Sequence, residues 1–417
     1  MAGAGEAPVF VVAGGGARSA LHQLRLAEGI RIVATPRHAA VLLIVGRVTE
    51  AATESIRHVH DQMAGPRVTV AWRHPEPAVV PVRAATDGGV AEATELIRRQ
   101  FHNVVNGVIA PEPAWLPDVD PVEWRGVGPY GHGGAGMTGG TPYGRPLALR
   151  APARDGLELD VLPLTVGPWF PALPAGLALR VSFQGDIAQV VEVVSADIVG
   201  FESPGGVVAR TGEPLLIRDL ELARARHHLE WMADTFRLAG IDRLALAAGR
   251  LAASIDPGDS ALVDRLATGA RRSLLGPMSL RGVGVLPSDI DLSGLGPIAR
   301  AAGRDDDLRA TEPAYREIGF EPVTRHGGDA WARFEQRAAE AVQAIELAGL
   351  AGDRRAFGAG EIEGPDGRHR VGEPTPATRL VTHLEQMLTG LEWGDLVTTV
   401  QSLDIDMESV TVGRAAA

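Results

Sequence analysis

Residues 32–49 read IVATPRHAAVLLIVGRVT, in which two apolar runs flank a Pro-Arg-His turn. The runs Ile30–Ala34 and Val41–Val45 lack the polar alternation of a half-exposed strand, so we predict strands that are buried on both faces. The apolar run Val9–Val12 and the segment Val68–Trp72 predict two more strands. Helical patterns lie between and after them, with leucines at 21, 24 and 26 and then at residues 50–63 and 90–101. Strands that alternate with helices predict a parallel α/β domain.

Residues 111–156 lose this periodicity. Repeated prolines and the run GPYGHGGAGMTGG exclude a helix or an inner strand there. We interpret the segment as a linker or an extended arm. A backbone so rich in glycine must be ordered by something else, either the rest of the chain or a partner, although a mere soluble tether is the other interpretation. Our candidates for partner contact are Tyr130, His132, Met137, Tyr143 and Arg145.

Residues 157–417 begin with alternating patterns. Strands are predicted at residues 162–166, 177–183 and 187–194, and the tight turn Gly185-Asp186 makes a β-hairpin of the last two. Helices are predicted beyond the hairpin, at residues 220–239, 242–253, 260–275 and 329–348. This part of the chain is therefore expected to be α+β and mainly helical, entered by a β-hairpin.

The amino-acid composition excludes several classes of chemistry. The chain has 417 residues, 45% of them hydrophobic, which is enough for two or three globular domains. It has no cysteine and no lysine, since all 40 basic residues are arginine. Disulfides, thiolate nucleophiles, cysteine-held zinc or iron–sulfur clusters, a P-loop lysine and a Schiff-base amine are all excluded. The formal net charge of −12 argues against nucleic acid as the main partner.

No signal peptide or membrane span is predicted. The start, MAGAGEAPVF, lacks a charged region followed by an apolar one, and the longest apolar run, at residues 39–45, is far below the ~18 residues of a span. We therefore expect the chain to be cytoplasmic and at most peripheral on a membrane.

Three stretches resemble one protein superfamily. Residues 32–49 resemble the cluster-carrying small subunit of complex I and of membrane-bound nickel–iron hydrogenases, where they lie in a flavodoxin-like domain. Residues 166–176, VGPWFPALPAG, resemble the N-terminal hairpin of the partner large subunit. Residues 280–333 are similar to a further large-subunit series, here GPIARAAG, DDLR and GDAWAR. Their order in the chain implies a fusion of the two subunits, joined by the arm.

The departures from the superfamily concern its cofactors. Cysteines that hold the cluster in the small subunit are replaced by the turn Gly14-Gly15-Gly16, and by Gly89 in a later turn. The cysteine pairs that hold nickel and iron in the large subunit are also absent. The hairpin tip carries histidine in the quinone-reducing relatives, and Phe170 and Ala175 occupy that neighbourhood here. The resemblance thus implies a chain with no redox cofactor and no catalytic or metal-binding residue.

The other candidates for chemistry are weaker. The glycines at 14–16 follow a strand and precede a helix, so they could cradle a phosphate, but the dinucleotide pattern is incomplete. None of the 12 histidines has a partner at metal-ligand spacing, and we expect surface or capping roles for them. The run Asp305-Asp306-Asp307 is interpreted as a solvated turn and helix cap.

Two functions follow from the resemblance. The first is a cofactor-free structural or coupling subunit, docked on the antiporter-like or complex I-like membrane arm of an ion-translocating complex, with a small-subunit-like domain at 1–110, the arm at 111–156 and a large-subunit-like domain at 157–417. The alternative is a subunit of a quinone-linked NADH dehydrogenase or hydrogenase-like oxidoreductase. A nucleotide-binding regulator that uses the glycine turn is a third and weaker possibility.

Overall fold

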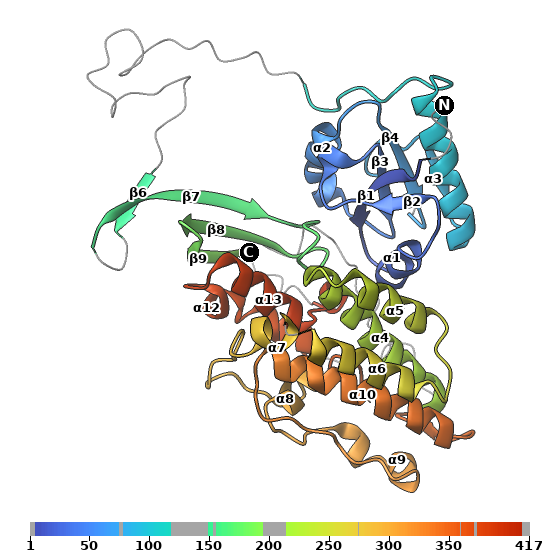
Figure 1. The fold of residues 1–417 in the computed structure, drawn as a ribbon, viewed down its shortest axis with the longest axis vertical. Coiled ribbons are helices and arrows are strands. Elements are labelled where there is room, and N and C mark those ends of the chain that lie inside the picture. Colours follow the sequence, from blue (N-terminus) through green and yellow to red (C-terminus); the bar gives the residue numbers. More distant parts are fainter. Residues whose placement is uncertain are drawn as a thin grey trace.

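The computed structural model describes residues 5–74, 78–117, 149–152, 156–194, 214–273, 275–358, 360–370 and 373–410. Figure 1 shows a small sheet with its helices at upper right, a larger group of helices below it, and a second, elongated sheet that extends to the left. We call the first part, from β1 to α3, the α/β unit, and the elements from β6 onward the body. No helix among the described residues combines the length and the apolar composition needed to cross a bilayer.

The α/β unit is built on a five-stranded parallel sheet. Its strands are β1 (Ala7–Ala13), β2 (Ile30–Ile32), β3 (Val41–Val45), β4 (Val68–Trp72) and β5 (Ala84–Thr86). They lie in the order β2-β1-β3-β4-β5, which is the order of flavodoxin-like sheets. Every residue of β3 and β4 is buried, which explains why the sequence shows no alternation there.

Helices cover both faces of this sheet. The helices α1 (Arg18–Leu24) and α3 (Val90–Val105) pack on the face that includes Leu43, and α2 (Thr53–Gln62) packs on the face that includes Leu42. Two 3₁₀ turns, η1 (Pro36–His38) and η2 (Glu50–Ala52), complete the connections.

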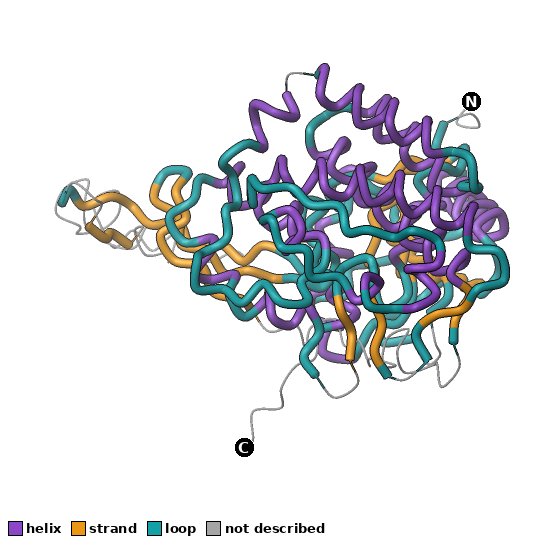
Figure 2. The backbone as a smooth tube through the Cα atoms, turned by 90° about the horizontal axis from the view of Figure 1, so that it is seen from below, coloured by secondary structure: helices purple, strands orange, loops and turns teal. Residues whose placement is uncertain are grey.

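The body begins with a four-stranded antiparallel sheet in the order β6-β7-β8-β9. Its strands are β6 (Leu149–Pro152), β7 (Glu158–Val166), β8 (Ala178–Gln184) and β9 (Ile187–Val194). Gly185 has φ 64° in the tight turn that joins β8 to β9, a conformation that favours glycine. Figure 2 shows these strands projecting to one side of the helices.

Two long helices form the centre of the body. Helix α4 (Ile217–Leu238) packs along α10 (Ala330–Leu350), and the side chain of Asp329 caps α10 by accepting from the Ala332 amide at 2.7 Å. The remaining helices surround them: α5 (Asp242–Ala253), α6 (Ser260–Arg272), α7 (Leu275–Leu280), α8 (Pro297–Ala301), α9 (Pro313–Glu317), α11 (Pro376–Val381), α12 (Leu384–Leu388) and α13 (Trp393–Leu403), with the 3₁₀ turns η6 (Leu308–Ala310) and η7 (Met407–Ser409). Short strand pairs join β10 (Leu215–Leu216) to β11 (Arg355–Ala356) and β12 (Glu361–Glu363) to β13 (Arg368–Arg370).

The predicted parallel α/β sheet, the hairpin and the helices after it are confirmed. One predicted helix, at residues 260–275, is wrong in extent, because α6 ends at Arg272 and α7 begins at Leu275. Most of the predicted arm lies outside the described residues, and so do all of its candidates for partner contact, namely Tyr130, His132, Met137, Tyr143 and Arg145.

Candidate functional site

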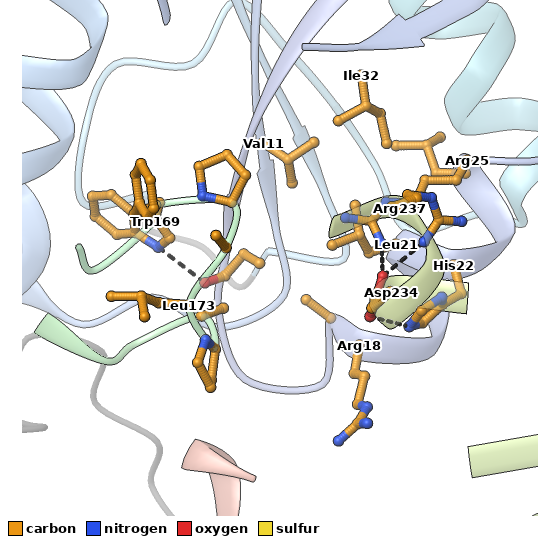
Figure 3. Close-up of a pocket in the computed structure, with 18 of the residues that line it drawn as sticks. Val11, Arg18, Leu21, His22, Arg25, Ile32, Trp169, Leu173, Asp234 and Arg237 are labelled. Atoms are coloured by element: carbon orange, nitrogen blue, oxygen red, sulfur yellow. Dashed lines mark hydrogen bonds and ion pairs between the residues drawn. The ribbon is translucent and has the colours of Figure 1, made fainter. Parts of the chain in front are cut away.

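A cavity of about 770 Å³ lies where the α/β unit meets the body. We call this meeting surface the joint. The α/β unit contributes the end of β1, α1 and β2, and the body contributes residues 169–175, the end of α4 and residues 404–408. Figure 3 shows Trp169 on one side of the cavity and Asp234 with three basic side chains on the other.

Asp234, on α4, binds basic groups from both parts of the molecule. Its carboxylate lies 3.3 Å from His22 Nε2, forms an ion pair with Arg25, and accepts from Arg237 at 2.7 Å. Burial alone would raise the pKa of Asp234, but the charge of Arg25, followed by that of His22, holds this pKa far below its usual range. The carboxylate is therefore charged at neutral pH and links α1 to α4.

Asp404 makes a second link across the joint. Its Oδ1 lies 2.7 Å from Arg18 Nη2, its Oδ2 lies 2.7 Å from His227 Nε2, and Arg337 Nη2 is 3.6 Å away. Asp404 is buried, yet the charge of Arg18 outweighs the effect of burial and keeps the pKa of Asp404 well below its usual range. Asp404 ends α13 with φ 52° and ψ 52°, a left-handed conformation that Asp and Asn tolerate better than most residues.

The glycine turn after β1 is closed by the chain's own groups. Gly14 N–H donates to Val45 O at 2.8 Å, Gly15 N–H to Arg47 O at 2.7 Å, and Gly16 N–H to Glu408 Oε1 at 2.9 Å. A Cβ at Gly14 would collide with the Arg47 carbonyl, which accounts for glycine there. All three amides have partners, so the turn does not present the open phosphate cradle considered from the sequence.

Three of the positions singled out from the sequence line the joint cavity. Gly14, Phe170 and Ala175 contribute to its wall, whereas Gly89 is the N-cap residue of α3 and lies outside the lining. Trp169, beside Phe170, donates from Nε1 to Ala13 O at 3.1 Å, and this bond holds the loop of residues 169–175 across the end of β1.

The series at residues 280–333 leads to a buried network of charges. Arg300 forms ion pairs with Glu340 at 2.7 Å, Asp307 at 2.9 Å and Glu363 at 3.0 Å. Arg309 pairs with Asp307 at 2.8 Å and with Glu221 at 3.1 Å. All of these side chains are almost completely buried. We call them, together with Arg224, Tyr315 and His228, the buried charge network.

The network holds more carboxyl groups than guanidinium groups. Tyr315 donates its hydroxyl to Glu221 at 2.6 Å, and Arg224 lies 3.3 Å from the same carboxylate. Three guanidinium groups thus face four carboxyl groups, those of Glu221, Asp307, Glu340 and Glu363. Burial, and then the charge of Asp307, raise the pKa of Glu363, while Arg300 acts in the opposite direction.

Two expectations from the sequence, the surface position of the histidines and the solvated position of Asp307, are wrong. His22, His60, His74 and His228 are buried and not surface residues. His60, for example, stacks on Trp115 with ring centroids 3.5 Å apart and binds Glu112 at 3.2 Å, contacts too distant in sequence for a local pattern to show. Asp307 does cap η6, as expected, but it is buried and not solvated because it lies between Arg300 and Arg309.

His228 predicts a dependence of stability on pH. Burial lowers its pKa from 6.5 to about 4, although Glu340 lies 3.4 Å away. Below pH 6.5 the unfolded chain takes up a proton that the folded chain excludes until pH falls to about 4. The free energy of unfolding therefore falls over this window, and His228 alone accounts for about 3 kcal/mol of that fall. Urea titrations at several pH values measure it.

The variant His228→Leu removes this titration. We expect its free energy of unfolding to depend on pH less steeply than that of the wild type between about pH 6.5 and 4. The control His58→Gln changes an exposed histidine on α2 and keeps the wild-type slope. Equal slopes for His228→Leu and the wild type would contradict the assignment.

Comparisons with known proteins match part of the body. Residues 276–363 match the family described as the respiratory-chain NADH dehydrogenase 49 kDa subunit. A subunit of the NADH-quinone oxidoreductase of Streptomyces coelicolor is 45% identical over 82 residues, which cover 18% of this chain and 21% of that protein. The chain thus spans about a fifth of the length of this curated relative. A chain of the membrane-bound sulfane sulfur reductase, an archaeal respiratory membrane complex, aligns with a TM-score of 0.41 and 18% identity, over 60% of this chain and 98% of that chain.

The matched segment supplies most of the buried charge network, including Arg300, Asp307, Arg309 and Glu340. The expected resemblance to the large subunit is confirmed over this segment, while the resemblance of the α/β unit to the small subunit stays a prediction. Over residues 276–363, therefore, this chain is similar to the 49 kDa subunit of the respiratory-chain NADH dehydrogenase.

Proposed function

We propose that the protein is a structural or coupling subunit of a complex I-like, ion-translocating membrane complex, and that it carries no redox cofactor itself. The similarity of residues 276–363 to a respiratory-chain subunit supports the first part. The second part is supported by the sequence, which contains no cysteine and therefore no thiolate ligand for a cluster or for nickel and iron.

The observation that carries this proposal is the charged joint. Asp404 and Asp234 belong to the body, and their partners Arg18, His22 and Arg25 belong to the α/β unit, on α1 and at its C-terminal end. Any movement of α1 relative to the body must either break these ion pairs or move the partner side chains of the body together with α1. A subunit that couples movements needs a contact between two packed parts that can take two arrangements, and we propose the charged joint as that contact.

The proposal extends to the division of the chain. Residues 1–110 act as the small-subunit-like domain and residues 157–417 as the large-subunit-like domain, while the arm at 111–156 contacts the membrane partners. In this arrangement Gly14, Gly15, Gly16 and Gly89 mark the lost cluster loops. The protein lies on the cytoplasmic face of the membrane and is held there by its partner subunits.

The alternative is a quinone-linked oxidoreductase subunit, and the joint cavity favours it. Its volume of about 770 Å³ lies within the range of small-molecule sites, and Trp169, Phe170 and Leu173 give it an apolar wall opposite the charged one. A quinone matches both walls, because the polar substituents of its ring suit the charged wall and its apolar tail suits the apolar wall.

Co-purification tests the coupling function. The tagged protein, expressed in its native host, is expected to leave gently solubilised membranes together with polytopic membrane subunits, and the deletion of residues 131–140 is expected to reduce their recovery several-fold. The control Asp353→Asn changes an exposed loop residue of the body and should recover them like the wild type. Recovery of the wild-type chain alone, from the soluble fraction, would overturn the proposal.

Quinone binding separates the two functions. Calorimetry with a short-chain ubiquinone is expected to show no saturable binding if the coupling function alone is correct. Saturable binding that Ala172→Phe weakens at least about tenfold, because the added ring fills the cavity, would favour the oxidoreductase.

A further inference from the structure

A second cavity, of about 860 Å³, opens at the carboxyl edge of the parallel sheet. Its lining includes one residue at or just after the carboxyl end of each of four strands. These are Gly15 after β1, Arg47 after β3, His74 after β4 and Thr86 at the end of β5. Open α/β sheets bind their ligands in this place, outside the carboxyl ends of the strands. The cavity shares no lining residue with the joint cavity, so what it binds is independent of the proposed function.

Arg73 gives the cavity an exposed cation. It has φ 53°, a left-handed conformation that is unfavourable for a residue with a side chain, and its guanidinium lies 5.0 Å from the centre of the Trp72 ring. Within the described part of the chain no carboxylate forms an ion pair with Arg73. Arg47 adds a second guanidinium to the wall. Arg73 therefore offers the cavity a positive charge that no carboxylate among the described residues neutralises.

His74 lies in the same wall and is only 7% exposed. Its Nδ1 is 2.8 Å from Gly46 O, and because a carbonyl only accepts, Nδ1 carries the proton. Its Nε2 is buried and has no partner among the described residues. A buried nitrogen without a partner is unfavourable, and a ligand hydroxyl that donates a hydrogen bond to it would remove this cost.

The acidic side chains of the cavity narrow the class of ligand. Glu92 accepts from the Thr86 hydroxyl, which in turn accepts from Gly88 N–H at 3.1 Å, so Glu92 is engaged in holding the loop. Asp87 is exposed and lines the cavity, so its carboxylate is available to accept from a ligand hydroxyl and would repel a second anion. The wall thus combines guanidinium groups for an anion with acceptors for hydroxyls.

We infer that this cavity binds a phosphate monoester that also carries hydroxyl groups, such as a sugar phosphate or a nucleoside monophosphate. Arg73 binds the phosphate, which suits the planar guanidinium, and Asp87 and His74 accept from the hydroxyls. The glycine turn at residues 14–16 takes no part through its amides, because these are bound within the chain.

Calorimetry on the full chain tests this inference with three probes. AMP is expected to bind saturably, inorganic phosphate to compete with it, and adenosine to give no saturable heat. The absence of saturable binding of both AMP and inorganic phosphate up to about 10 mM would overturn the inference. Adenosine that binds as well as AMP would also overturn it, because the phosphate would then have no role.

Two variants assign the binding to these residues. Arg73→Gly removes the guanidinium and relieves the left-handed backbone, so the chain should fold at least as well as the wild type. His74→Asn keeps a donor where Nδ1 meets Gly46 O and removes Nε2. Each should weaken AMP binding at least about tenfold. The control Arg57→Gln, on the exposed side of α2, should bind like the wild type. Unchanged affinity in both Arg73→Gly and His74→Asn would overturn the assignment.

Discussion

Arg300→Met is expected to lower the free energy of unfolding by about 3–5 kcal/mol. The side chain of Arg300 is completely buried and binds Glu340, Asp307 and Glu363 at 2.7–3.0 Å. Methionine fills much of the space but leaves these carboxylates without the cation that compensates for their loss of water. Chemical denaturation of the two proteins at pH 7 measures the difference.

Two further variants frame this result. Arg304→Met changes an exposed arginine four residues further along and should alter the free energy of unfolding by no more than about 0.5 kcal/mol. Arg300→Lys keeps the charge but not the planar fork, so it should fall between the wild type and Arg300→Met, and it serves as the folded variant if Arg300→Met does not accumulate. A loss below about 1 kcal/mol for Arg300→Met would show that the network does not stabilise the body in this way.

Asp404→Asn is expected to loosen the joint. The substitution leaves Arg18 and Arg337 near an uncharged amide and should cost about 3–5 kcal/mol. Asparagine tolerates the left-handed backbone of residue 404, so the loss reflects charge and not strain. Amide hydrogen exchange should show weaker protection in α1, the helix that Arg18 begins.

The control for this change is Asp353→Asn, on an exposed loop after α10. It should leave the protection of α1 and the free energy of unfolding almost unchanged. If α1 in Asp404→Asn exchanges as slowly as in the wild type, the pair Arg18–Asp404 does not hold the two parts together.

The sequence predicts the long elements because their signals are local. Strand β3 is an uninterrupted apolar run, β4 is apolar except for Thr69, and α4 and α10 are long enough for a helical period to be seen. Short elements such as β5, with three residues, and α8, with five, carry too few residues for any period, and contacts with the rest of the chain decide them.

The candidate site is only partly predictable, for a related reason. The hairpin loop stands out in the sequence through Phe170 and Ala175, and these residues do line the joint cavity. The charged groups that face them do not stand out, because Arg18 and Asp404 are 386 residues apart and neither has a distinctive neighbourhood. Burial of His228 is equally hidden from the sequence, since α4 packs against the distant helix α10.

The position of Glu408 also has a consequence for how the protein is made. Gly16 N–H donates to a carboxylate 392 residues further along the chain. A ribosome that adds about 5–20 residues per second takes roughly 20–80 s to synthesise that length. For the part of this interval that follows the synthesis of the α/β unit, the amide of Gly16 and the guanidinium of Arg18 lack their partners Glu408 and Asp404. The contact between the glycine turn and Glu408 therefore cannot form before translation has passed residue 408, and until then this surface of the α/β unit stays open to chaperones.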